Sequence, residues 1–432
     1  HWYTGQYDYT TIQGGSSKSF VDDYLRKYKQ HTNYNSINVY ATYNKDFGNH
    51  HFKVMAGFNQ ESSYQETLDT YSYNQAVLDV PAMSSGTGTI KATDSYSEYA
   101  IRGGFFRVNY NYLDKYLLEV NGRYDGSSKF PKSSRFGFFP SVSAGWQIAQ
   151  ERFMNSTRHW LDGLKLRASY GVIGNQNINP YTFTPSMSVN NKATSWIIDD
   201  TYVTSISSLP ALVSQNFTWE KVGTINVGLD VNLFNNRLSG VFEWYQRNTN
   251  GMLAPGVQLP AVVGASAPYQ NTADMRTRGW ELSLNWRDQI GKVGYRIGFN
   301  LSDYKSEIIK YDDNAATKLL SSYYPGQTLG EIWGYVVDGY YTVDDFVDTS
   351  SWQLKEGVTS INGYNVRPGD VKFKNLRDDD TSTNVITSGD NTFDNPGDRK
   401  VIGNTTPRYQ YGINLGMNYA GFDLNVILQG TG

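Results

Sequence analysis

Carboxylates and histidines are the residues of this sequence that could do catalytic or metal chemistry. Asp344-Asp345 and the acidic run at 378–380 have the residue types of a glycosidase pair, but both stand in polar stretches, without apolar surroundings that would hold a proton on an acid. The tandem pair His50-His51 shares a metal poorly, because adjacent side chains of an extended chain point to opposite sides. The sequence has five scattered His and no Cys, so we predict no catalytic residue, no metal and no cofactor.

Aromatic residues in the polar stretches and charged residues on polar strand faces are better suited to binding a ligand. Aromatic rings offer flat apolar surfaces on which sugar rings can stack, and charged side chains hydrogen-bond to sugars and peptides. The competing interpretation is that the aromatic residues pack the loops together and that the charged residues balance one another. The ligand contacts that we select are Trp196, Tyr202, Tyr269, Trp352, Arg123 and Arg247.

Strands must position these residues, because apolar and polar side chains alternate one by one along much of the chain. At 279–287, Trp280 and Trp286 lie at the two ends of an apolar face, and Glu281 and Arg287 lie on the opposite face. We predict about thirteen strands, the first of them only a remnant within 1–10. The clearest strands are predicted at 36–47, 98–112, 115–125, 135–149, 164–171, 222–234, 279–287, 295–302, 409–419 and 422–429.

The predicted connections alternate between very short and very long. Tight turns on one side and long loops on the other are typical of a barrel that spans an outer membrane. The short connections lie at 45–51, 113–115, 234–237, 287–292 and 420–421. The long connections, which we predict to be extracellular, lie at about 64–97, 175–218, 250–277 and 307–407.

Ionised residues within the strands indicate what surrounds the two faces. Lys165 with Arg167, and Glu243 with Arg247, require a face in contact with water, whereas the apolar face requires lipid or another sheet. A membrane strand needs 9–11 residues, and several predicted strands reach that length. We therefore predict an all-β fold, a transmembrane antiparallel β-barrel. A soluble sandwich or propeller is the competing interpretation.

The composition excludes some functions and leaves others open. The formal net charge is −3 and no basic run occurs, so we predict no nucleic-acid partner. No run of about 18 apolar residues is present, which excludes helical membrane spans. The 34 Tyr, 20 Phe and 10 Trp fit a large soluble β protein and a barrel with aromatic belts equally well.

Three groups of motifs, in this order along the chain, resemble one family. The motifs are GSSKF at 126–130, RFGFFPS at 135–141 and AGW at 144–146; LKLRASYG at 164–171 and GNQ at 174–176; RPGDVKF at 367–373 and DRKVIG at 398–403. The sequence GYVVDG at 334–339 is a weaker fourth match. Together they resemble the SusC/RagA family of TonB-dependent outer-membrane transporters of Bacteroidetes, over most of 99–430.

The resemblance implies a 22-stranded barrel in the outer membrane, of which residues 1–432 would be one partial barrel domain without the plug. It implies as partners a SusD-like surface lipoprotein that acts as a lid, the TonB complex, outer-membrane lipid and an oligosaccharide or peptide cargo. The function that it implies is TonB-dependent import, with no enzyme activity. A surface glycan-binding β protein without transport is the alternative. Residues 375–380 lack the glycines of the family's acidic turn, so we expect a solvated loop there and not a calcium site.

Overall fold

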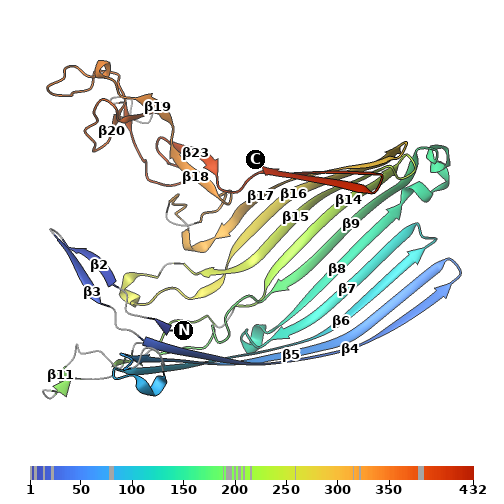
Figure 1. Cartoon of the computed structure of the whole chain (residues 1–432), viewed down its shortest axis with the longest axis horizontal. Coiled ribbons are helices and arrows are strands. Elements are labelled where there is room, and N and C mark those ends of the chain that lie inside the picture. The colour runs from blue at the N-terminus through green and yellow to red at the C-terminus, as the bar shows by residue number, and fades with distance from the viewer. Residues whose placement is uncertain are drawn as a thin grey trace.

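A single large antiparallel sheet dominates the computed structural model of the chain (Figure 1). Side chains are described for residues 24–76, 82–187, 210–214, 217–257, 259–314, 316–320, 323–377 and 384–432. The sheet has 13 strands, in the order β1-β4-β5-β6-β7-β8-β9-β14-β15-β16-β17-β24-β25, so the predicted all-β antiparallel fold and strand number are confirmed. Its strands are β1 (Trp2–Tyr3), β4 (Tyr24–Phe47), β5 (His50–Tyr73), β6 (Ile90–Tyr112), β7 (Tyr116–Ser127), β8 (Phe136–Gln147), β9 (Leu161–Asn175), β14 (Glu220–Leu233), β15 (Leu238–Pro255), β16 (Tyr269–Ile290), β17 (Val293–Tyr311), β24 (Tyr409–Tyr419) and β25 (Phe422–Thr431).

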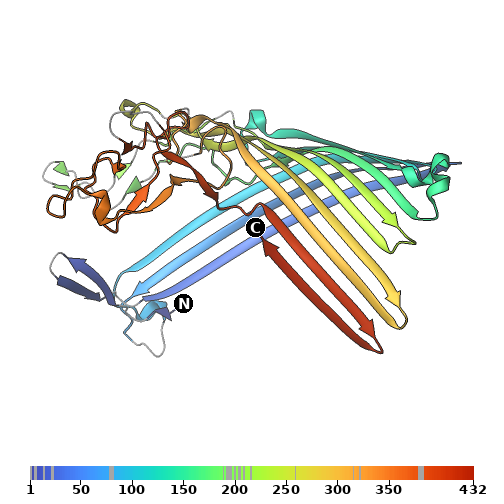
Figure 2. The same ribbon diagram turned by 90° about the horizontal axis from the view of Figure 1, so that it is seen from above.

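The connections are sorted by length between the two ends of the sheet. The hairpin turns gather at one end, which we call the turn end, and the long connections gather at the other, the loop end (Figures 1 and 2). At the turn end, neighbouring strands are joined by two to four residues at 48–49, 113–115, 234–237, 291–292 and 420–421, as predicted. The exception is the β8–β9 connection, which contains the 3-10 helices η3 (Ile148–Gln150) and η4 (Arg152–Thr157).

Each long strand has one apolar and one polar face, but only along part of its length. On β4, Ile37, Val39 and Tyr43 lie on the apolar face, whereas Asn35 and His31, further toward the loop end, continue the same face with polar side chains. The segment from Ile37 to Phe47 has the 9–11 residues that a membrane strand needs. The apolar face is therefore a band, and β4 continues well beyond it.

Two predicted loops are wrong in extent for this reason. The 64–97 loop is confined to 74–89, because Tyr64–Tyr73 and Ile90–Ser97 pair with each other as the ends of β5 and β6. The 250–277 loop is confined to 256–268, because the ends of β15 and β16 pair likewise. Strands that have left the band carry polar residues on both faces. Their alternation disappears from the sequence while their backbone hydrogen bonds continue.

The remaining elements belong to the connections and the chain start. Near the chain start, β1 joins the sheet by pairing with Tyr24 and Leu25. The other strand pairs are β2 (Tyr7–Ile12) with β3 (Gly15–Phe20), β10 (Val189–Asn190) with β13 (Ile206–Ser207), β11 (Ile197–Ile198) with β12 (Thr201–Tyr202), β18 (Glu331–Tyr335) with β23 (Arg399–Asn404), β19 (Val337–Tyr340) with β21 (Val371–Phe373), and β20 (Ser360–Ile361) with β22 (Val385–Ile386). Further 3-10 helices are η1 (Met83–Ser85), η2 (Lys132–Ser134), η5 (Ala261–Val263), η6 (Asp312–Asn314) and η7 (Val343–Asp345). Among the described residues, no helix is long and apolar enough to cross a membrane.

Candidate functional site

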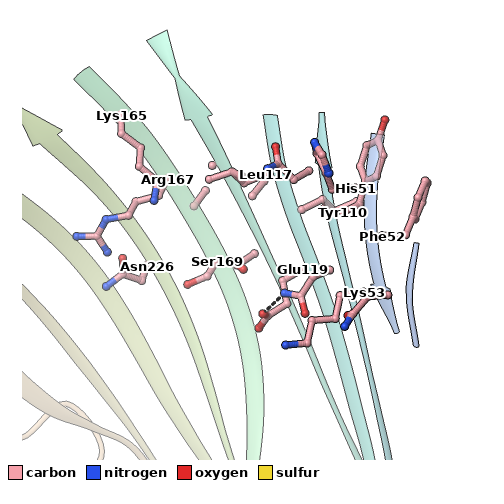
Figure 3. Close-up of a pocket in the computed structure, with 18 of the residues that line it drawn as sticks. His51, Phe52, Lys53, Tyr110, Leu117, Glu119, Lys165, Arg167, Ser169 and Asn226 are labelled. Carbon is pink, nitrogen blue, oxygen red and sulfur yellow. Dashed lines mark hydrogen bonds between the residues drawn. The ribbon is translucent and has the colours of Figure 1, made fainter. Parts of the chain in front are cut away.

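The polar face of strands β4 to β9 and β14 carries a cavity of about 680 Å³ (Figure 3). The period of two along each strand brings the side chains together, because every second residue of neighbouring strands points into it. The antiparallel register aligns Lys53 with Asn109, and Asn109 with Glu119. The polar residues that line the cavity are Asn44, Asp46, His51, Lys53, Asn109, Asn111, Glu119, Ser143, Lys165, Arg167, Ser169 and Asn226.

Glu119 lies at the centre of a hydrogen-bond network in this cavity. Its carboxylate accepts hydrogen bonds from Asn109 and from Asn121 Nδ2, the latter at 2.7 Å. Arg107 Nε donates to Asn121 Oδ1 at 2.7 Å and lies 4.0 Å from the Glu119 carboxylate. Both sides of the carboxylate are thus held, so its position on the wall is fixed.

Arg167 connects three strands on the same face. From β9 it donates to Asp230 on β14, at 3.1 and 3.2 Å, and to Glu243 on β15. Gly228 makes room for it, since a Cβ there would come within 2.8 Å of the guanidinium carbon. One Arg against two carboxylates leaves an excess negative charge on this part of the wall.

Unlike Arg167, two lysines of the cavity have no carboxylate partner among the described residues. Neither Lys53 nor Lys165 forms an ion pair with another described residue. Asp46, which lines the β4 side of the cavity, shares a hydrogen bond of 2.7 Å with His51 Nδ1. The cavity therefore offers two ammonium donors to a solute, in addition to the amide of Asn44, whereas the Asn226 amide donates to Glu243 at 3.1 Å.

The predicted charged contacts lie on the polar face but not in this cavity. Arg123 lines a neighbouring cavity, donates to Asp125 at 3.0 and 2.9 Å, and lies 5.2 Å from the centroid of the Phe105 ring. Arg247 is exposed on β15, without an ion-pair partner among the residues whose side chains are described. The cavity residues Asn44, Lys53 and Asn109 were not selected from the sequence, because Asn and Lys on a polar face also fit plain solvation.

The structure does not bring the predicted loop aromatics together. Tyr269 begins β16 and is 56% exposed. Trp352 packs edge-on against Phe346, at 5.5 Å, in a small core that also contains Tyr341. Trp196 lies outside the described residues, as does the side chain of Tyr202, whose backbone belongs to β12.

Of the two acidic clusters considered in the sequence, the structure describes only Asp344-Asp345. Asp345 accepts a hydrogen bond from the Thr342 backbone at 2.7 Å and from Lys372 Nζ at 3.2 Å, so it serves the local fold of the loop. The run 378–380 lies outside the described residues. No group of three His, Cys, Asp or Glu among the described residues is placed to hold a metal.

Asp345 makes the small core around Tyr341 sensitive to acid. The hydrogen bond from the Thr342 backbone and the contact with Lys372 lower the pKa of Asp345, and hydrogen bonds from Ser350 and Ser351 lower that of Asp348. A lowered pKa stabilises the fold above the unfolded value, near 3.9, and this contribution is lost as the pH falls through the folded value. We expect pepsin to cleave 341–366 faster at pH 2 than at pH 4, and Asp345→Asn to reduce that difference. An identical pH dependence in wild type and variant would contradict this assignment.

Comparison with known proteins shows the family to which this sheet belongs. The family model described as TonB dependent receptor-like, beta-barrel, matches residues 1–431. The chain belongs to this family. Among curated relatives of this receptor barrel, TonB-dependent receptor P3 of Formosa agariphila is 29% identical over 447 residues, covering 99% of the chain and 41% of the relative. TonB-dependent receptor SusC of Bacteroides thetaiotaomicron is 32% identical over 283 residues, covering 64% of the chain and 27% of the relative. The chain thus spans less than half the length of either.

Solved structures agree with this assignment at the level of the fold. The RagAB peptide importer in its open-open state matches the receptor barrel with a TM-score of 0.74 at 22% identity, over 95% of the chain and 41% of that chain. The closed-closed state gives 0.72 at 21% identity. The SusC/RagA-like character and the outer-membrane location predicted from the motifs are therefore confirmed.

In an outer-membrane receptor barrel the apolar band faces lipid and the polar face lines the lumen. At the turn end, the band of this receptor carries a row of neighbouring aromatic rings across adjacent strands; the first pair is tilted and the next two are stacked. The ring centroids of His50 and Tyr112 are 4.6 Å apart, those of Tyr112 and Tyr116 6.3 Å, and those of Tyr116 and Trp146 6.5 Å. This row is an aromatic belt, placed where a membrane interface requires one.

Proposed function

We propose that the receptor to which this chain belongs imports an oligosaccharide or a peptide across the outer membrane. The TonB complex would supply the energy, and a SusD-like lipoprotein would cover the loop end. The observation that carries this proposal is the polar lumen wall, where hydrogen-bonded acids such as Glu119 alternate with lysines that have no ion-pair partner among the described residues. Such a wall exchanges hydrogen bonds with a polar solute without enclosing it in an apolar pocket.

The relatives support the class of cargo and leave its identity to experiment. The RagAB structures are described as those of a peptide importer, and SusC is named as a TonB-dependent receptor. Oligosaccharides and peptides are both rich in hydroxyl, amide and carbonyl groups. The Asn side chains and the two cavity lysines can bond to either class, whereas Lys53 and Lys165 favour a cargo that carries carboxylates.

Energy-dependent accumulation is the property that tests the proposal. Cells that carry the native receptor, and cells from which its gene is deleted, are offered a mixture of maltodextrins and tryptic peptides as probes. We expect receptor-dependent depletion of one probe class from the medium, and loss of that depletion when an uncoupler removes the proton-motive force. Changing Lys53 and Lys165 together to Gln should slow the uptake of acidic probes several-fold, while the exposed loop variant Lys318→Gln should not.

The alternative function, a surface glycan-binding β protein, predicts a different result. Binding without transport would give cell-associated probe that an uncoupler does not change and that remains accessible to enzymes added outside. Such a result, with no depletion beyond stoichiometric binding, would refute the transport proposal.

A further inference from the structure

The β8–β9 connection is longer than every other connection at the turn end of the described sheet. Its neighbours have two to four residues, whereas this one extends from 148 to 160 and includes η3 and η4 (Figures 1 and 2). A hairpin at this end needs no such length to reverse the chain. The need to join two strands therefore does not explain the additional residues.

Glu151 attaches this connection to the lipid-facing side of the barrel. Its carboxylate accepts hydrogen bonds from Tyr116 Oη at 2.6 Å and from Trp146 Nε1 at 3.1 Å, and both of these residues lie on the apolar face. Lys115 Nζ donates to the same carboxylate at 3.2 Å. The segment thus lies directly beside the aromatic belt, at the level of the membrane interface.

The exposed side chains of the connection have the composition of an interfacial membrane anchor. Phe153 is 65% exposed and Trp160 is 39% exposed. Arg152 and Arg158 are exposed as well, and neither forms an ion pair with a described residue. Aromatic rings beside guanidinium groups suit the boundary between acyl chains and phosphate headgroups.

The acidic groups nearby cancel only part of this charge. Glu151 forms an ion pair with Lys115 at 3.2 Å. Asp162 is exposed and stays negatively charged while it accepts the backbone N–H of Asn236 at 2.8 Å, so it offsets one of the two guanidinium charges. The connection therefore presents two guanidinium groups to the interface, and guanidinium binds phosphate in a bidentate manner.

We propose that the β8–β9 connection is a binding site for the phosphate of an anionic phospholipid in the periplasmic leaflet. Arg152 and Arg158 would hold the headgroup, while Phe153 and Trp160 would insert among the upper acyl carbons. The site is separate from the lumen, so it fixes the height and tilt of the barrel in the bilayer and takes no part in cargo transfer.

Native mass spectrometry of the receptor purified from outer membranes tests this site. After delipidation, the protein is equilibrated with equal amounts of phosphatidylglycerol and phosphatidylcholine. We expect several-fold preferential retention of phosphatidylglycerol, lost in Arg152→Gln/Arg158→Gln and kept in Arg152→Lys/Arg158→Lys. The charge-matched control Lys132→Gln/Lys318→Gln, at the loop end, should retain the preference. Equal retention of both lipids by wild type, or an unchanged preference in the Arg→Gln variant, would overturn the proposal.

A second measurement on the unaltered receptor does not depend on the folding of any variant. Amide hydrogen exchange of 148–160 is compared in nanodiscs of phosphatidylglycerol and of phosphatidylcholine. We expect at least threefold slower exchange of this segment in phosphatidylglycerol, with no change at the 291–292 turn. Equal exchange in both lipids would leave the segment as a surface for a periplasmic protein and would overturn the lipid site.

Discussion

Replacing Trp219 with Ala is expected to destabilise the loop end of the barrel by about 3–5 kcal/mol, the usual cost of removing a large aromatic side chain from a core. Trp219 is 4% exposed, and its ring lies 4.9 Å from that of Phe130 and 5.2 Å from that of Phe139. Its Nε1 also donates to the Arg135 carbonyl at 2.9 Å. Removing the side chain opens a cavity and leaves that carbonyl without its indole donor.

The expected damage is local because this cluster holds one loop to the wall. Phe217 belongs to the same core, Ser134 Oγ donates to its carbonyl at 2.8 Å, and Thr218 Oγ1 donates back to the Ser134 carbonyl at 2.9 Å. Asn271 Oδ1 on β16 accepts a hydrogen bond from the Thr218 backbone N–H at 2.8 Å. The end of the 176–219 connection is thus fixed to three neighbouring elements.

Limited proteolysis of the native receptor measures this effect. Cleavage within 176–219 should accelerate by at least a hundredfold in Trp219→Ala, while the membrane band stays protected. Trp219→Phe should fall between the two, because it keeps a ring but loses the indole N–H. Tyr181→Ala, which removes a 51% exposed aromatic residue from the same connection, is the matched control. If Trp219→Ala and Tyr181→Ala were cleaved equally slowly, the anchor role would be refuted.

Replacing Asp398 with Ala is expected to cost a similar amount, about 3–5 kcal/mol, in the 312–408 connection. The Asp398 side chain is fully buried, and its carboxylate accepts the backbone N–H groups of Leu376, Arg377 and Thr387, at 2.7, 3.2 and 2.7 Å. Each buried N–H that loses its acceptor costs about 1–3 kcal/mol. Because the three donors come from two separate parts of the connection, the loss of their shared acceptor should separate 376–377 from 387.

Hydrogen exchange at these three amides gives a direct measurement. We expect all three to exchange much faster in Asp398→Ala, and Asp398→Asn to protect some of them, since its amide oxygen can still accept. Asp394→Ala, at an exposed acid four residues earlier, should leave the three rates unchanged. Unaltered exchange in Asp398→Ala would show that other groups organise this connection.

The membrane band could be predicted from the sequence because lipid imposes a pattern on it. Residues 279–287 alternate strictly, and β16 includes them with Trp280 and Trp286 on the apolar face. The family motifs added the location and the class of protein. Within the band, burial against lipid on one face and contact with water on the other determine every second residue.

Outside the band, lipid no longer imposes a pattern on the sequence. The predicted bounds of the strands and loops were therefore wrong there. Residues 64–73 read as a loop because Gln65 and Asp69 are polar whichever way they point, yet they continue β5. The cavity lysines were equally inconspicuous, because their significance depends on which charges lie opposite them across three strands. Register between distant segments, such as Arg167 with Glu243, is not contained in the periodicity of either segment.

The extension of β4, β5 and β6 beyond the apolar band has a practical consequence for work on whole cells. From Tyr24 to Asn35, β4 continues for roughly 40 Å of paired strand at about 3.3 Å per residue. The tip at 82–89 is therefore carried on a stiff hairpin stalk, clear of the bulky headgroups that screen the membrane surface. Because we predict that the loop end is extracellular, we expect an epitope tag or fluorophore inserted at this tip to report on intact cells from a fixed height, without a flexible linker.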